Sequence, residues 1–241
     1  MCVLIYCPPG TNLPPEDTLR DCWSANPDGA GYAYSIGGLV QFSKGYMSLK
    51  AYLKALRKLS IPKASHLILH FRIGTHGGKS PALTHPFPLM DEANIHALSG
   101  VTESVIAHNG ILSCPVHDGH SDTSSYVLSI AGERKVYAST GAEGTAYLLD
   151  KACKGSKVIE LTGHGPVFYG DKWEEDSDGR YFSNLNHEFF NFGFQSKFDF
   201  ELQPAPWYAE KESCYFCGNN VPFANLDDNV CPHCGEILQF N

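Results

Sequence analysis

Two Cys-x-x-Cys knuckles near the C-terminus constrain this chain more than any other feature of its sequence. Cys214 and Cys217 form the first knuckle, and Cys231 and Cys234 form the second after a spacer of 13 residues. Together they can turn four thiolates toward one ion, which is the tetrahedral ligand set that zinc prefers. A unit of about 30 residues has too small a core to fold alone, so bound metal would supply much of its folding free energy. The spacing predicts a structural Zn²⁺ in a C-terminal zinc ribbon, with iron on the same sulfurs as the alternative.

A change of composition separates this ribbon from the rest of the chain. Residues 204–212 contain two prolines and few apolar positions, which is typical of a linker. We therefore expect a first domain over residues 1–203, a linker over 204–212 and the ribbon over 213–241. From Pro206 to Asn241 the chain carries one lysine and five acidic residues, a balance that repels phosphates. Direct nucleic-acid binding is disfavoured, and the ribbon is expected to be structural or to dock a protein.

The composition is that of an acidic, soluble protein. The 241 residues carry a formal net charge of −8, and 43% of them are hydrophobic, which is enough for a large core. No run of about 18 apolar residues occurs, so the sequence predicts no membrane span and no membrane partner. The apolar run at residues 3–6 is too short for a signal segment, and the nine cysteines are therefore expected as thiols or metal ligands in a reducing cytoplasm.

Short apolar runs before the linker predict a mixed α+β fold. Strands are expected over residues 3–6, 31–36, 66–71 and 104–112, and hairpin strands of a second sheet over 158–163, 165–170 and 180–186. Apolar residues recur at helical spacing from 48 to 59, with Ser48 as the expected N-cap. Another helix is expected to begin near Asp122 and to turn Tyr126, Val127 and Ile130 inward, and a short one to cover residues 146–152.

Cys2 directly follows the initiator methionine. Cysteine is small enough for that methionine to be removed, which would leave Cys2 with a free α-amine. An α-amine with a pKa of about 8 can serve as the base for the adjacent thiol, whose pKa is about 8.5, without any histidine. The alternative is a small buried side chain at the start of an edge strand.

Five further motifs follow Cys2 along the chain. They are Asn26-Pro-Asp-Gly29, His70-Phe-Arg72-Ile-Gly-Thr75-His76-Gly-Gly, His85-Pro-Phe87, His108-Asn109-Gly110 and Ser121-Asp122-Thr123. With Cys2 they resemble, in matching order, the class II glutamine amidotransferases of the N-terminal nucleophile hydrolase superfamily, over roughly residues 2–190. The resemblance implies a four-layer αββα sandwich, in which helices cover two antiparallel sheets packed face to face.

The resemblance also implies a site for the amide of an α-amino acid. Arg72 is suited to grip the α-carboxylate of such a substrate, helped by the Thr75 hydroxyl and by loop amides near His76. His76 is equally suited to shaping the loop. Asp122 offers the negative charge that holds the α-ammonium group.

The implied chemistry is the hydrolysis of glutamine by Cys2. Attack of the thiolate on the side-chain amide would release ammonia and leave a γ-glutamyl thioester for water to hydrolyse, with no cofactor needed. The Asn109 side chain and the Gly110 N–H are expected to form the oxyanion hole. His70 and His108 lie in predicted strands and are expected to be satisfied core histidines.

Larger members of the family that the chain resembles consume the ammonia in a synthase domain. We expect no such domain here, because the residues after the linker are assigned to zinc. We therefore expect a glutaminase subunit that supplies ammonia to a separate partner synthase. One alternative is a stand-alone amidohydrolase acting on a γ-glutamyl or other small amide. Another is a catalytically silent relative that serves as a binding or regulatory module.

Overall fold

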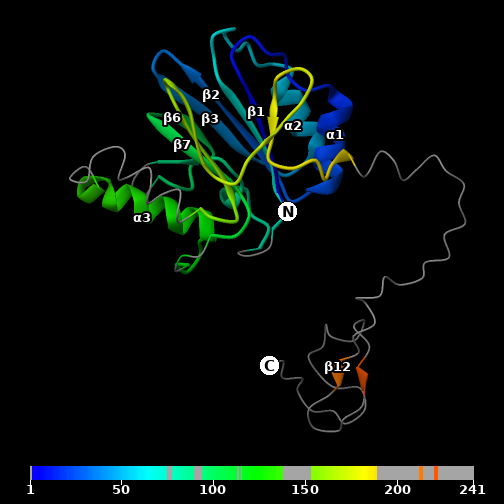
Figure 1. The fold of residues 1–241 in the computed structure, drawn as a ribbon, viewed down its shortest axis with the longest axis vertical. Coiled ribbons are helices and arrows are strands. Elements are labelled where there is room, and N and C mark those ends of the chain that lie inside the picture. The colour runs from blue at the N-terminus through cyan, green and yellow to red at the C-terminus, as the bar shows by residue number, and fades with distance from the viewer. Residues whose placement is uncertain are drawn as a thin grey trace, which may run out of the picture. The chain divides into compact units, whose positions relative to one another are not determined.

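The computed structural model describes residues 2–74, 78–89, 94–112, 114, 116–137 and 153–188, with the backbone alone for 130–137, and the backbone of residues 212–213 and 220–221. The chain divides into two compact units, residues 1–194 and 195–241 (Figure 1). In the second unit, β12 (Glu212–Ser213) pairs antiparallel with β13 (Asn220–Val221), and the two strands bracket the first predicted knuckle in the sequence. The linker and ribbon boundaries stay predictions.

The first unit is an α+β structure with two antiparallel sheets. The larger sheet has seven strands in the order β10 (Glu174–Glu175), β11 (Tyr181–Phe182), β1 (Val3–Cys7), β4 (Leu67–Phe71), β2 (Ala30–Ile36), β3 (Leu39–Tyr46) and β6 (Ser99–Thr102). The smaller sheet has four strands in the order β5 (Phe87–Pro88), β7 (Ser104–Asn109), β8 (Lys157–Thr162) and β9 (Gly165–Gly170).

Three α-helices lie in the described residues. α1 (Glu16–Ala25) and α2 (Leu49–Leu56) lie on one side of the sheets, and α3 (Asp122–Tyr137) lies on the other (Figure 1). α2 begins after Ser48, whose side chain accepts a hydrogen bond from the backbone N–H of Ala51 at 3.3 Å and so caps the first turn. None of the described helices is long and apolar enough to cross a membrane.

β1 is an unbroken apolar run because both of its faces are covered. Val3 and Ile5 belong to a buried cluster that includes side chains of α1 and α2. Leu4 and Tyr6 belong to another cluster, which they share with strands β7 and β8 of the smaller sheet. A strand with one face in water would alternate apolar and polar residues instead.

The outer face of the smaller sheet packs against α3. Tyr126 and Val127 of this helix share a buried cluster with Ile106 of β7 and Val158 of β8. This confirms the expected start of the helix near Asp122 and the inward direction of Tyr126 and Val127. The side chain of Ile130 and the helix expected at residues 146–152 lie outside the described residues.

The strands expected at the start of the chain are confirmed as β1, β2, β4 and β7, and the hairpin at 158–170 is confirmed as β8 and β9. The prediction for residues 180–186 is wrong. β11 joins the first sheet, where Ile5 faces Phe182 and Tyr6 faces Tyr181. Both faces of β1 are apolar, so the local pattern carries no signal for which distant segment completes its edge.

Candidate functional site

A cavity of about 30 Å³ lies where five segments of the first unit meet: the residue before β1, the end of β4, the turn before β5, the end of β7 and the start of α3. Its lining residues are Cys2, Arg72, Ile73, His85, His108, Gly110, Ser121, Asp122 and Thr123. The antiparallel pairing of Val3 with Phe71 brings Cys2 beside Arg72. Four of the predicted site residues therefore meet here, although Cys2 and Asp122 are 120 positions apart in the sequence.

The Cys2 thiol lies against the backbone that follows β4. Its sulfur is 3.5 Å from the N–H of Ile73, which donates to it, and 3.6 Å from the Ile73 carbonyl oxygen. Burial raises the pKa of the thiol; the negative charge of Asp122 acts in the same direction, and the Ile73 N–H and the Arg72 charge only partly oppose them. The Cys2 carbonyl accepts a hydrogen bond from Asn184 Nδ2 at 2.7 Å. The residue is thus fixed on both its side chain and its backbone.

Arg72 is 4% exposed and is held by the turn that follows α1. Its backbone N–H donates to the Gly29 carbonyl at 2.8 Å, and its own carbonyl accepts from the Asp28 N–H at 2.9 Å. Arg72 Nη1 donates to the Gly78 carbonyl at 2.9 Å. A Cβ on Gly74 would lie 2.9 Å from Nη1, so a glycine there makes room for the guanidinium.

Asp28 explains why an Asn-Pro-Asp-Gly turn sits beside this site. Its carboxylate accepts a hydrogen bond from the Gly74 N–H at 2.9 Å and pairs with the Lys79 ammonium. Burial raises the pKa of this carboxyl, but Lys79, the Gly74 N–H and the Arg72 charge outweigh it, so the pKa lies below its usual value. Asp28 therefore stays ionised and holds the segment after Arg72.

Asn109 is the last residue of β7, and Gly110 follows it at the cavity. Asn109 Nδ2 donates to the Ser183 hydroxyl at 3.0 Å, while Asn109 Oδ1 is buried with no partner in the part of the chain that the structure describes. Asn109 is not among the residues that line the cavity, whereas Gly110 is. Gly110 has a φ of +141°, and a Cβ there would lie 2.3 Å from the Ser156 hydroxyl oxygen. The position therefore requires glycine. The unpartnered Oδ1 of Asn109 can only accept, so an oxyanion would have to use the second N–H of Nδ2, whose first N–H donates to Ser183.

Both oxygens of the Asp122 carboxylate are held at the start of α3. Oδ2 accepts a hydrogen bond from the Leu112 N–H at 3.0 Å, and Oδ1 accepts one from the Thr123 N–H at 2.8 Å. Cys114 lies behind this turn and donates its thiol to the Asp122 carbonyl at 3.3 Å. Asp122 therefore presents a fixed negative charge to the cavity.

Three buried histidines lie beside the cavity. His85 Nδ1 is 2.6 Å from His70 Nε2, which is also 3.2 Å from the His108 carbonyl oxygen. Burial lowers the pKa of His70 to about 3 and that of His108 to about 4. Burial and the neighbouring charges also lower the pKa of His85 well below its ordinary value. All three imidazoles are therefore neutral near pH 7.

His70 and His108 are buried as expected, but in the described part of the chain the expectation that their hydrogen bonds are satisfied is wrong for one ring nitrogen of each. His70 Nδ1 and His108 Nε2 have no hydrogen-bond partner within the described ranges. His85 and His108 also line the cavity, so they belong to the candidate site. The His85-Pro-Phe87 and His108-Asn109-Gly110 motifs carried the signal that could have placed them there.

Two residues of the site were missed by the sequence analysis. Ser183 accepts hydrogen bonds from Asn109 Nδ2 and from the Leu4 N–H, and Asn184 holds the Cys2 carbonyl. Both lie in the segment that was assigned to the wrong sheet. A serine and an asparagine after a short strand are common in turns, so no local signal could have found them.

The predicted residues Thr75 and His76 lie outside the described residues, and so do the four predicted zinc ligands. Within the ranges that the structure describes, no group of three or more His, Cys, Asp and Glu side chains is arranged to hold a metal ion. The predicted zinc site therefore remains a prediction from the spacing of the knuckles.

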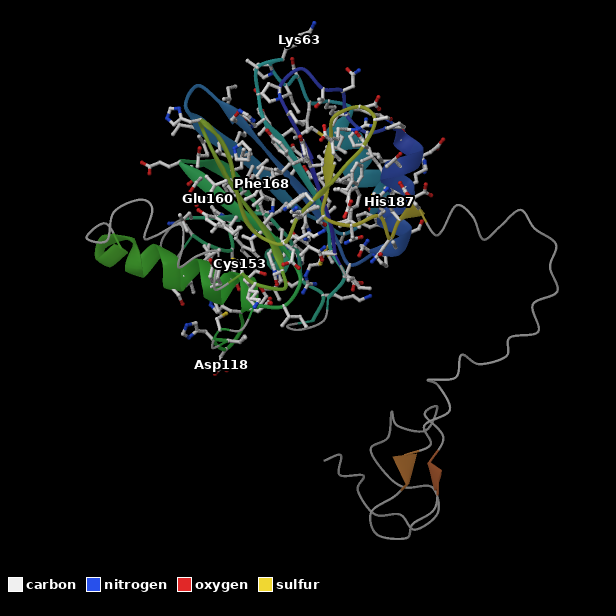
Figure 2. The ribbon with its side chains drawn as sticks, in the orientation of Figure 1. Lys63, Asp118, Cys153, Glu160, Phe168 and His187 are labelled. Carbon is white, nitrogen blue, oxygen red and sulfur yellow. The ribbon has the colours of Figure 1, made fainter. Side chains whose placement is uncertain are left out.

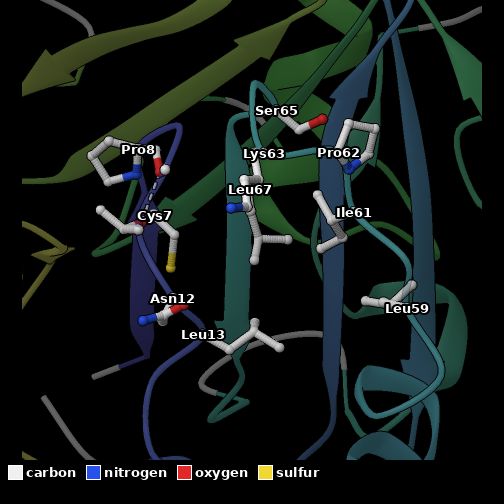
Figure 3. Close-up of a pocket in the computed structure, with 12 residues that line it drawn as sticks. Cys7, Pro8, Asn12, Leu13, Leu59, Ile61, Pro62, Lys63, Ser65 and Leu67 are labelled. Carbon is white, nitrogen blue, oxygen red and sulfur yellow. Dashed lines mark hydrogen bonds between the residues drawn. The ribbon is translucent and has the colours of Figure 1, made fainter.

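A second cavity, of about 330 Å³, lies at the other end of β1 (Figure 3). Leu59 and Leu67 are among the apolar side chains that line it, together with the Cys7 thiol. Burial raises the pKa of this thiol to about 12, which makes it a poor nucleophile at neutral pH. Lys63 beside this cavity and Asp118 near the start of α3 lie at opposite ends of the unit (Figure 2). The smaller cavity therefore remains the candidate site.

Neither a protein-family model nor a curated protein matches the chain.

Proposed function

We propose that this protein is an amide hydrolase of the glutamine amidotransferase type, with Cys2 as its nucleophile. The observation that carries this proposal is the meeting of Cys2, Arg72, Gly110 and Asp122 at one cavity. These residues supply a thiol, a cation, a backbone N–H and an anion. A zwitterionic amino acid with a side-chain amide requires these four groups in one place.

The first step needs a base close to the thiol. Because burial raises the pKa of Cys2, the thiolate is a minor form at neutral pH, and an acceptor must take the proton as the sulfur attacks. In the described part of the chain, the hydrogen-bond partner of the sulfur is the backbone of Ile73, not an imidazole. We assign the role of base to the α-amine of Cys2, freed by removal of Met1.

The proposed reaction then runs in two halves. The thiol proton passes to the α-amine while the sulfur bonds to the amide carbon, and the oxyanion accepts hydrogen bonds from the Gly110 N–H and the Asn109 amide. The ammonium returns the proton to the departing nitrogen, the C–N bond breaks and ammonia leaves. Water then adds to the thioester, which gives the carboxylic acid and restores the thiol.

Two charged side chains define the substrate in this proposal. Arg72 binds the α-carboxylate, with Thr75 and His76 as further contacts from the loop, and Asp122 binds the α-ammonium group. Since a carboxylate and a guanidinium are both fixed by hydrogen bonds, the site favours L-glutamine or a related γ-amide over amides without these charges.

We assign the first unit to the four-layer αββα sandwich of the N-terminal nucleophile hydrolases. Three buried clusters support this: one lies between α1, α2 and the larger sheet, one lies between the two sheets, and one lies between the smaller sheet and α3. The ammonia acceptor would be a separate partner synthase in the cytoplasm. Cys214, Cys217, Cys231 and Cys234 would hold a structural Zn²⁺, for which four thiolates are a fitting donor set.

Intact mass before and after treatment with the glutamine analogue 6-diazo-5-oxo-L-norleucine tests the proposal. The purified full chain is expected to lack Met1 and to gain one covalent adduct. Cys2→Ala is expected to gain none, whereas Cys114→Ser, which alters another thiol near Asp122, is expected to keep the adduct.

The other outcomes separate the alternative functions. A chain that retains Met1 and gains no adduct would contradict the proposed activity and favour a silent binding module. A chain that loses Met1, gains no adduct and still hydrolyses another small amide would be a stand-alone amidohydrolase.

A further inference from the structure

A line of hydrogen bonds connects the Asp122 carboxylate to a buried histidine. The Thr123 N–H donates to Asp122 Oδ1 at 2.8 Å, and the Thr123 hydroxyl lies 3.3 Å from the same oxygen. On its other side, this hydroxyl lies 3.0 Å from His108 Nδ1. Thr123 is 1% exposed and His108 is 2% exposed, and both line the candidate site.

The direction of these hydrogen bonds follows from the chemistry of the groups. An ionised carboxylate can only accept, so the Thr123 hydroxyl directs its hydrogen to Asp122. The hydroxyl oxygen is then the acceptor for His108, whose hydrogen must lie on Nδ1. His108 Nε2 is left without a hydrogen, and it has no partner among the described residues. A neutral His108 fits this arrangement, because burial lowers its pKa to about 4.

We infer that Thr123 and His108 are positioning residues that hold the Asp122 carboxylate in place for the α-ammonium group of the substrate. The inference rests on the proposed function, in which Asp122 binds that group. Leu112 fixes Oδ2 through its backbone N–H, so the hydroxyl of Thr123 and its N–H complete the hold on Oδ1. A carboxylate fixed at both oxygens discriminates a charged group from an uncharged one without reorganisation when the substrate binds.

The test compares two amides that differ at the group Asp122 binds. L-Glutamine carries an α-ammonium group, and glutaramate is the same γ-amide without it. In the full chain, Thr123→Val keeps the shape of the side chain and removes the hydroxyl. The measured quantity is kcat/KM for glutamine divided by kcat/KM for glutaramate. Thr123→Val is expected to lower this ratio about tenfold, mainly through a higher KM for glutamine. Thr123→Ser restores the hydroxyl and is expected to restore most of this ratio.

Ser129→Ala is the matched control on the same helix. Its hydroxyl donates to the Ser125 carbonyl at 3.0 Å and lies away from the candidate site, so the ratio is expected to stay as in the wild type. If Thr123→Val does not fold, His108→Asn and His108→Leu make the same comparison, since asparagine keeps an N–H near the position of Nδ1 and leucine does not.

A loss of activity in Thr123→Val that is equal for the two amides would overturn the inference, because it would show a merely structural role. An unchanged ratio would overturn it as well. A wild-type chain that hydrolyses neither amide would overturn the proposed function, and the inference with it. A wild type that prefers glutamine, with a ratio that falls in Thr123→Val and recovers in Thr123→Ser, would support both.

Discussion

Gly110 is the residue at which the candidate site leaves least room. Its φ of +141° is a conformation that side chains with a Cβ rarely adopt, and a Cβ there would overlap the Ser156 side chain and approach its backbone. The same residue offers its N–H to the proposed oxyanion. Two constraints, one on packing and one on chemistry, therefore fall on a single position.

We expect Gly110→Ala to lower the free energy of unfolding by about 2–4 kcal/mol, because backbone strain adds to the steric overlap. Gly119→Ala is the control, since Gly119 also has a positive φ, of +77°, but a Cβ there would meet nothing within 4 Å. This control is expected to cost about 1 kcal/mol, from strain alone. Urea unfolding of the two variants and the wild type measures both values, and equal losses would contradict the steric argument.

At the scale of elements, the segment after β11 joins β1, which directly follows the proposed nucleophile, to β7, which ends at the proposed oxyanion hole. The Ser183 hydroxyl accepts hydrogen bonds from the Leu4 N–H at 2.9 Å and from Asn109 Nδ2 at 3.0 Å, and it is buried. The Ser183 N–H donates to the Leu4 carbonyl at 2.9 Å. One side chain thus connects β1 of the larger sheet with β7 of the smaller one.

Ser183→Ala is expected to lower the free energy of unfolding by about 2–4 kcal/mol, because it leaves two buried donors unpaired. Asn186→Ala, at an exposed position of the same segment, is expected to change it by no more than about 0.5 kcal/mol. Chemical denaturation gives both values. A Ser183→Ala variant as stable as Asn186→Ala would show that water replaces the lost acceptor.

The elements that could be predicted from the sequence are those with a continuous local signal. β1, β4 and α2 have apolar residues at the spacing of a strand or a helix, and α2 also has a capping serine. α1 was not predicted, because Pro15 supplies no side-chain cap and the helix buries only Leu19 and Cys22. β3 was not predicted either, since a lysine occupies one of its buried positions and breaks the apolar alternation.

The candidate site likewise contains residues that could be predicted from the sequence and residues that could not. For four of the predicted residues, the residue type itself indicates the chemistry. The structure brings these four together: Cys2, Arg72, Gly110 and Asp122. The two residues that were not predicted, Ser183 and Asn184, contribute through hydrogen bonds to segments far away in the sequence. Which distant segments meet depends on sheet order, and a local pattern does not encode it.

At the scale of the whole molecule, the buried histidines make the free energy of unfolding depend on pH. The pKa values of His70, His85 and His108 in the folded chain lie far below the ordinary value of about 6.5. Below pH 6.5 or so, the unfolded chain therefore binds protons that the folded chain does not. The stability that these groups contribute is complete above about pH 6.5 and is lost as the pH falls toward about 4.

The free energy of unfolding is expected to fall by up to about 4 kcal/mol per pH unit between about pH 6 and pH 4, with about 1.4 kcal/mol from each of the three histidines. His70→Gln removes one titrating group, so its slope is expected to be shallower by about 1 kcal/mol per pH unit. Urea unfolding across this range measures the slope, with a variant of the exposed His164 as control. An unchanged slope in His70→Gln would contradict the assignment.

The place of β1 between β4 and β11 has a consequence for protein synthesis. Asn184, which holds the Cys2 carbonyl, is synthesised 182 positions after Cys2. β1 can pair with β4 early, but its edge with β11 and the hold on the Cys2 carbonyl form only when nearly the whole first unit has been synthesised. In the proposed function, the removal of Met1 is therefore expected to precede the step in which Asn184 holds the Cys2 carbonyl.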